Sequence, residues 1–198
     1  MANDCSYDMR VVGESKEAVE RMGRILGYKD PEFFLYRVFD MNPAAKEAAR
    51  DAQFKQYWTL DYFGDVAWGP DPWIDGIPDP NNKSETGAHY SNLSEICKAL
   101  KIGVEVWAQE IGNANQWHFV VNPAGESYVD ERYCDLKVED DGEGGEKLVG
   151  GFDDGFMDWS PAGDIMETFS VKDDEAKLTP ADIAETVSAN VNPLEIQD

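Results

Sequence analysis

CSYDMRVVGESKEAVERMGRILG, residues 5–27, contains the clearest structural pattern in the chain. From Cys5 to Val11 every second side chain is apolar and the ones between are polar, which is the period of a half-buried strand. Ser15 is a good helix N-cap, the apolar residues after it recur at helical spacing, and Gly27 stands where such a helix ends. The sequence therefore predicts a strand followed at once by an amphipathic helix.

Two proline motifs follow this opening. Asp30-Pro31 and Asn42-Pro43 each combine a capping residue with proline at the first helical position, so we predict a short aromatic helix over residues 31–39 and an alanine-rich helix over residues 43–53. Residues 54–68 are aromatic and β-prone, and they predict one or two strands with a turn at Gly64-Asp65.

The second half of the chain begins with a proline-rich stretch. Four prolines and a polar run predict a long loop without regular structure over residues 69–90. Asn92 caps the next predicted helix and Gly103 closes it. Strands at 104–111, 117–121 and 126–130, joined by turn-forming residues, predict an antiparallel meander.

Charge is the strongest compositional signal. The chain has 40 acidic and 17 basic residues and a net charge of −23. Proteins that bind DNA gain most of their affinity by neutralising phosphates with Lys and Arg, so this chain would repel a nucleic-acid backbone and, for the same reason, an anionic membrane surface. An acidic surface favours basic protein partners, metal cations or solubility alone.

The acidity is uneven along the chain. Residues 135–198 hold 18 of the acids but only 4 of the bases. We therefore divide the chain into an α+β domain over residues 1–134, with its long loop at 69–90, and an acidic extension over residues 135–198 that ends in a helix after Thr179-Pro180.

The chain shows no sign of export or of membrane insertion. Its first four residues contain neither a basic region nor an apolar run, and no stretch approaches 18 apolar residues. Cys5, Cys97 and Cys134 are an odd number of widely spaced cysteines, which is typical of reduced, buried thiols. We expect a protein of the host-cell cytoplasm.

The predicted order of elements is that of a ferredoxin-like α+β fold with insertions, an antiparallel sheet with helices packed on one face. Two segments point to a more specific group of proteins with this fold. Met1-Ala2-Asn3-Asp4-Cys5-Ser6 runs into the alternating strand, and Val66-Ala67-Trp68-Gly69-Pro70 precedes the helix that Leu93-Ser94 opens. Both resemble the YubB-type ferredoxin-like family of phage and plasmid proteins, in which Met-Ala-Asn-Trp-Cys begins the chain and Ala-Trp-Ser-Pro-Pro precedes the same helix and strand.

The resemblance covers scattered parts of residues 1–130 and departs from the family in three places. Position 4 is Asp4 where the family has Trp, the family's Asn-Trp-Gly-Thr-Lys segment is absent, and the insertion between Trp68 and Leu93 is long. The resemblance implies the fold and a mobile-element origin. It brings no catalytic residues with it.

Catalytic and metal-binding patterns are weak. His89 and His118 stand alone and no two cysteines are closely spaced, which disfavours a zinc site. Cys134 could meet a histidine in space, but without any local nucleophile motif we favour a buried thiol. Phosphate-binding glycine motifs are absent from the sequence, so we expect no cofactor.

Acids and aromatics together suggest a binding surface. Residues 139–146 and 153–158 mix carboxylates with glycines, but the spacing of an EF-hand is missing, so a solvated loop is favoured over a calcium site. Among the tryptophans and tyrosines of residues 58–73 we expect Trp58 and Tyr62 in the core, and Trp73 at the surface. The predicted partner-binding residues are Trp68, Trp73, Asp140, Asp141, Glu143, Asp153, Asp154, Asp158 and Trp159.

Three functions stay open at this point. The first is a non-enzymatic interaction protein that binds and inhibits a basic host protein of nucleic-acid binding or defence, as a DNA mimic. The second is a metal-assisted enzyme that uses clustered carboxylates. The third is an accessory protein with no activity of its own.

Overall fold

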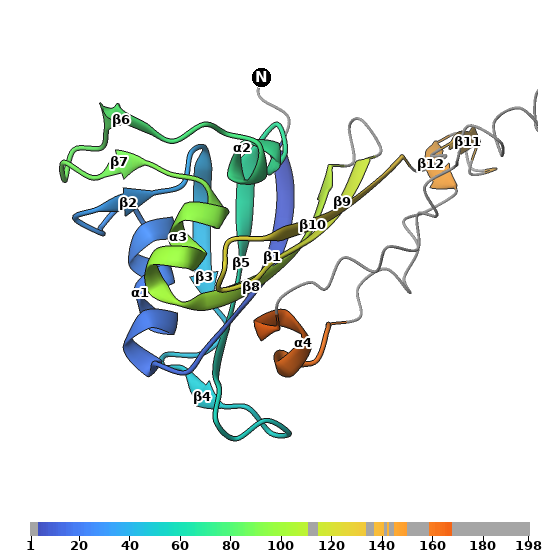
Figure 1. Cartoon of the computed structure of the whole chain (residues 1–198). Coiled ribbons are helices and arrows are strands. Elements are labelled where there is room, and N and C mark those ends of the chain that lie inside the picture. Colours follow the sequence, from blue (N-terminus) through green and yellow to red (C-terminus); the bar gives the residue numbers. More distant parts are fainter. Residues whose placement is uncertain are drawn as a thin grey trace, which may run out of the picture.

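The computed structural model describes residues 4–110, 115–133, 137–140, 142, 145–149 and 159–167. Its main feature is a seven-stranded sheet in the order β10-β9-β8-β1-β5-β3, with β4 also paired to β5. All its pairings are antiparallel (Figure 1). The prediction of a mixed helix-and-sheet chain built mainly on an antiparallel sheet is confirmed.

The strands of this sheet are β1 (Asp4–Gly13), β3 (Val38–Pro43), β4 (Ala49–Arg50), β5 (Trp58–Ala67), β8 (Ile102–Glu110), β9 (Asn115–Val121) and β10 (Ser127–Tyr133). A three-stranded sheet contains β2 (Phe33–Phe34), β6 (Asp79–Lys83) and β7 (His89–Tyr90), and a hairpin joins β11 (Lys137–Asp140) to β12 (Glu146–Val149). The helices are α1 (Lys16–Leu26), α2 (Asp71–Ile74), α3 (Leu93–Leu100) and α4 (Ala162–Met166).

β1 and α1 form as predicted. β1 pairs with β5 on one side and with β8 on the other, and Met9 faces Tyr62 and Val106 in these two registers. The alternating side chains from Cys5 to Val11 are at most 2% exposed. The Ser15 hydroxyl accepts a hydrogen bond from the Ala18 N–H at 3.3 Å, and α1 ends before Gly27.

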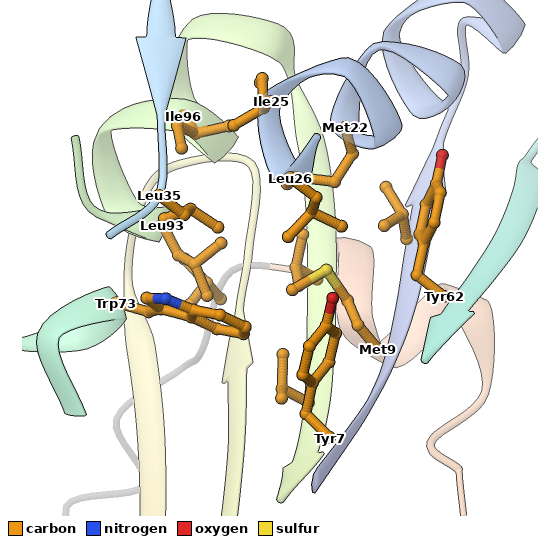
Figure 2. Close-up of a cluster of buried hydrophobic side chains, with 14 of the residues drawn as sticks. Tyr7, Met9, Met22, Ile25, Leu26, Leu35, Tyr62, Trp73, Leu93 and Ile96 are labelled. Atoms are coloured by element: carbon orange, nitrogen blue, oxygen red, sulfur yellow. The ribbon is translucent and has the colours of Figure 1, made fainter. Parts of the chain in front are cut away.

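The core lies between the sheet and two helices, α1 and α3, on one face of the sheet (Figure 1). Figure 2 shows Leu26 of α1 directly above Met9 of β1, and Ile25 of α1 beside Ile96 of α3. α4 packs on the opposite face, where Ala162 and Ile165 contact Val12 of β1 and Val120 of β9.

The later helix and the meander are also confirmed. The Asn92 side chain accepts a hydrogen bond from the Glu95 N–H at 2.9 Å and caps α3. The helix ends at Lys101, in a left-handed conformation, rather than at Gly103, which lies within β8. β8, β9 and β10 are consecutive antiparallel neighbours; residues 111–114 of the first connection lie outside the described residues, as does the helix predicted after Thr179.

The helix predicted over residues 31–39 is wrong. Asp30 does use its side chain as a cap does, but it closes a turn: one carboxylate oxygen accepts the N–H groups of Glu32 and Phe33 at 3.0 and 3.1 Å. Arg21 of α1 holds the same carboxylate with two hydrogen bonds, at 2.7 and 2.9 Å. The chain then extends, because Phe33 and Phe34 pair in parallel with β7.

The alanine-rich helix predicted from Pro43 is also wrong. Residues 38–43 form the edge strand β3, where proline is tolerated at a strand end, and the Ala44 N–H donates to the carbonyl of Asp61 at 2.8 Å. Pairing with β5 overrides the helix propensity of the alanines. Gly64 is not at a turn: it lies within β5, where a Cβ atom would clash with the carbonyl oxygen of Asp40 on β3.

Residues 69–90 are not an irregular loop, since they contain α2, β6 and β7. Trp73 of α2 was expected at the surface, and this expectation is wrong because its side chain is fully buried. Its ring meets Tyr7 edge to face, with ring centroids 5.0 Å apart, and its indole N–H donates to the carbonyl of Tyr36 at 2.9 Å (Figure 2). The proline-rich segment therefore folds inward around one tryptophan.

Trp73→Ala tests this placement of the proline-rich segment. Removing a fully buried tryptophan is expected to lower the free energy of unfolding by about 3–5 kcal/mol, measured by urea denaturation. The matched control is Trp68→Ala, at an exposed tryptophan, which should change the free energy by less than about 1 kcal/mol. Equal effects of the two substitutions would contradict the packing of Trp73.

Candidate interaction surface

Exposed aromatic side chains gather where β3 pairs with β5. Seven large apolar side chains are exposed in the part of the chain that the structure describes, and four of them, Tyr36, Phe39, Phe63 and Trp68, lie on or beside these two strands. Each of the four is between 42% and 61% exposed. Such clustering is typical of binding surfaces, whereas single exposed apolar residues are ordinary.

Phe39 is exposed because β3 is irregular. The register between β3 and β5 shifts between Val38 and Asp40, so Phe39 is an extra residue on the edge strand. A bulge of this type re-aims side chains at a sheet edge. We call the group Tyr36, Arg37, Phe39, Asp40, Phe63, Asp65 and Trp68 the β3–β5 surface.

Arg37 joins two of the aromatics. Its guanidinium carbon lies 4.7 Å from the ring centre of Trp68 and 5.1 Å from that of Tyr36. Its backbone carbonyl accepts the N–H of Ala67 at 3.1 Å, which places the ends of β3 and β5 together. Within the described residues Arg37 has no ion pair with a carboxylate, so the aromatic faces are its neighbours in place of an acid.

The backbone at this corner is strained. Arg37 and Trp68 have φ angles of 65° and 58°, in the left-handed region that side-chain-bearing residues rarely adopt. Each such conformation costs about 1 kcal/mol or more and persists only where the surroundings impose it. Strain of this kind clusters at functional sites, and here it holds the cation and the indole in one stack.

An acidic hollow continues the surface along the same strands. It has a volume of about 350 Å³ and is lined by the carboxylates of Asp8, Asp40 and Asp65 around Phe63. Asp40 and Asp65 are directly opposite each other across β3 and β5, a like-charge pairing that destabilises a sheet. Burial, and then the nearby charge of Asp61, raise the pKa of Asp8.

The carboxylates of the hollow are available to a cation. None of the three forms an ion pair with a Lys or Arg among the residues described. Asp40 is oriented by two local donors, the Met41 N–H at 2.8 Å and the Asn42 side-chain amide at 2.9 Å. A guanidinium or ammonium group entering the hollow would relieve the repulsion between the acids and lie against the face of Phe63.

The predicted site residues do not come together. Trp68 lies on the β3–β5 surface and Trp73 is in the core. Asp140 belongs to β11, and its side chain lies outside the described part of the structure. The remaining predicted acids, Asp141, Glu143, Asp153, Asp154 and Asp158, lie outside the described residues.

Trp159 lies in a different place, on the α4 side of the sheet. The guanidinium of Arg10 stands 4.7 Å from its ring centre and forms an ion pair with Asp61 at 3.0 Å. Next to it, Ser160 donates its N–H and its hydroxyl to the buried carboxylate of Glu105, at 2.9 and 2.7 Å. Residues 159–167 are therefore part of the folded domain, although they belong to the acidic extension.

Two signals in the sequence could have identified the surface. Phe63 and Asp65 alternate with the buried Tyr62 and Val66 in period two, which indicates that they point to the outer face of a strand. The aromatic run at residues 33–39 contains Tyr36 and Phe39, but the helix predicted there gave no reason to place them with Trp68.

The candidate groups for nucleophilic or metal chemistry are the cysteines, the histidines and the acids. The described residues contain no group of three or more His, Cys, Asp or Glu side chains that could hold a metal ion. Burial, and then the charges of Glu110 and Asp71, raise the pKa of the Cys5 thiol to about 12, and burial raises that of Cys97 further. The ring Nε2 of His118 lies 2.8 Å from a carboxylate oxygen of Glu105, which accepts the hydrogen bond, and Cys134 lies outside the described residues.

Among the described residues no helix is long and apolar enough to cross a membrane. The chain matches no family model, no curated protein and no solved structure with which it was compared.

The buried thiols give a direct test of this packing. In a Cys134→Ser variant, Cys5 and Cys97 are expected to stay unreactive towards a thiol reagent at about pH 8, because both are buried and protonated. Unfolding in guanidinium chloride should then release two reactive thiols. Rapid reaction of either thiol in the native protein would show that the core around β1 and α3 is open.

Proposed function

We propose that this chain is an acidic, non-enzymatic interaction protein that binds a basic protein through the β3–β5 surface. The observation that carries the proposal is the acidic hollow, in which Asp8, Asp40 and Asp65 surround the exposed Phe63 without an ion pair among the described residues. A partner's Arg or Lys would supply the missing charge.

The composition of the surface supports the same proposal. Trp, Tyr and Arg are the residues enriched in the energetic centres of protein interfaces, and Trp68, Tyr36 and Arg37 stack together here. The net charge of −23 would steer a basic partner towards the chain from a distance and speed association.

The partner that we propose is a host protein that binds nucleic acid or acts in defence, which the chain would inhibit by mimicking DNA. Carboxylates on a protein surface can occupy a site that is built for phosphates, since both are anionic and accept hydrogen bonds from Arg. A role of this kind fits a cytoplasmic protein of a phage or plasmid.

The proposed origin rests on the YubB-type resemblance, and the proposed fold family is ferredoxin-like. Supporting it, the strand order β8-β1-β5-β3 is produced by the chain order β1, α1, β3, β5, α3, β8. That is an antiparallel sheet in which the last strand, the first and the third lie side by side, with both helices on one face.

The test uses a fluorescent nona-arginine peptide as a stand-in for an Arg-rich surface. Wild-type protein is expected to bind it, and Asp8→Asn/Asp40→Asn/Asp65→Asn and Phe63→Ala are each expected to weaken binding by about tenfold or more. The matched control is Glu14→Gln/Glu17→Gln/Asp75→Asn, which removes the same number of charges from exposed positions elsewhere.

Equal weakening by the two triple variants would mean that the net charge alone attracts the peptide and would refute the β3–β5 surface. Salt provides a second check, because a contact made of charges should weaken steeply between about 50 and 300 mM NaCl. Affinity that is indifferent to salt would contradict the DNA-mimic proposal.

A further inference from the structure

We propose that a second hollow, between an aromatic wall and the connection from β6 to β7, is a binding site for a planar aromatic ligand that carries one anionic group. The hollow has a volume of about 450 Å³. Tyr28, Phe34 and Tyr36 line one side, and residues 82–86 line the other. It borders the β3–β5 surface at Tyr36 but does not include the acidic hollow.

The aromatic wall is a continuous row of rings. Tyr28 and Phe34 have ring centroids 5.7 Å apart, Phe34 and Tyr90 are 5.9 Å apart, and Tyr90 and Tyr36 are 5.7 Å apart. Phe34 is largely buried but still lines the hollow and Tyr90 is buried next to it, whereas Tyr36 is 42% exposed and Tyr28 is partly buried. Rings arranged in this way offer a planar ligand stacking and edge contacts.

The two sides of the hollow are tied together before any ligand arrives. The Tyr28 hydroxyl accepts the N–H of Val38 at 3.1 Å, and the Tyr90 hydroxyl donates to the carbonyl of Pro72 at 2.7 Å. On the opposite side the Thr86 hydroxyl donates to the carbonyl of Asp30 at 3.1 Å and pairs with the Ser84 hydroxyl at 2.7 Å. A site that is already ordered loses less entropy when it binds.

The lining of this hollow is not acidic, in contrast to the chain as a whole. Lys83 and Glu85 both line the hollow, and Arg37 stacks on Tyr36 at its edge. Neither cation has an ion pair within the described part of the chain. The site thus has two basic side chains and one acidic side chain, whereas the whole chain has 17 basic and 40 acidic residues. This local excess of positive charge favours an anionic group on the ligand.

Size and chemistry together define the ligand class. A volume of about 450 Å³ lies in the range of small-molecule sites, which combine apolar walls with a few polar groups that fix orientation. The wall accepts a planar ring, the Ser84 hydroxyl oxygen can accept a hydrogen bond from it because its proton is used on Thr86, and Lys83 can neutralise the anion. Nucleotides and aromatic carboxylates share this chemistry.

Calorimetric titration of the full chain with four compounds tests the proposal. Adenosine monophosphate and indole-3-acetate carry both a ring and an anion, adenosine carries only the ring, and inorganic phosphate only the anion. At least one of the first two is expected to bind about tenfold more tightly than both adenosine and phosphate. The tighter binder of the two shows whether the ligand is a nucleotide or an aromatic carboxylate.

Variants locate the binding. Lys83→Ala and Tyr36→Ala, both at exposed positions, are each expected to lower the affinity for the better-binding of adenosine monophosphate and indole-3-acetate by about fivefold or more. Lys55→Ala, at a matched exposed lysine elsewhere, should leave this affinity unchanged. The triple variant of the acidic hollow should bind the same compound with an affinity within about twofold of wild type. The proposal for this site and the proposal for the acidic hollow can therefore be refuted independently. The proposal is overturned if no ringed anion exceeds adenosine and phosphate, or if Lys83→Ala and Tyr36→Ala bind as wild type.

Discussion

The structure depends on the central strand β1, which pairs with β5 along its whole length on one side and with β8 from Ser6 to Gly13 on the other. This central strand fixes the two faces of the sheet, because its side chains alternate. Tyr7 and Met9 enter the core beneath α1 and α3 (Figure 2), while the alternation of the strand places Asp8 and Arg10 on the other face. A slip of one residue would exchange these faces and bury two charges, so the register is strongly specified.

The face of the sheet opposite α1 and α3 is covered at one end and open at the other. Towards the Gly13 end of β1, residues 159–167 cover the sheet, and their Ser160 satisfies the buried carboxylate of Glu105. At the other end Asp8 stays beside Phe63 and Asp65 in an open hollow, with the edge strand β3 as its rim. The bulge at Phe39 and the left-handed residues Arg37 and Trp68 place further aromatics at this rim. An arrangement that combines backbone strain, like charges and exposed rings stabilises the isolated domain poorly, which is why we assign it to binding.

Local patterns predicted the parts of the fold that local physics controls. The alternation in β1, the Ser15 and Asn92 caps and the meander depend on neighbours in sequence, and all three are confirmed. The helices predicted in residues 31–53 are wrong because contacts with other segments decide the structure there. Arg21 of α1 binds the carboxylate of Asp30, which closes a turn, and Pro43 pairs with β5 as part of a strand. The proline-rich composition of residues 69–90 predicts a loop and an exposed Trp73, whereas in the fold its indole N–H donates to the carbonyl of Tyr36 and the ring is buried. Of the predicted site only Trp68 belongs to the surface proposed here, since its other members meet through a pairing that the sequence did not predict.

The central claim is that the β3–β5 surface is where a basic partner binds. Amide hydrogen exchange of the full chain, free and saturated with the nona-arginine peptide at low salt, tests it most directly because it locates the contact without any substitution. If the peptide binds at the β3–β5 surface, exchange becomes slower in residues 36–42 and 61–68, with the α1 and α3 segments unchanged. Protection confined to residues 135–198, with none at β3 or β5, would contradict it.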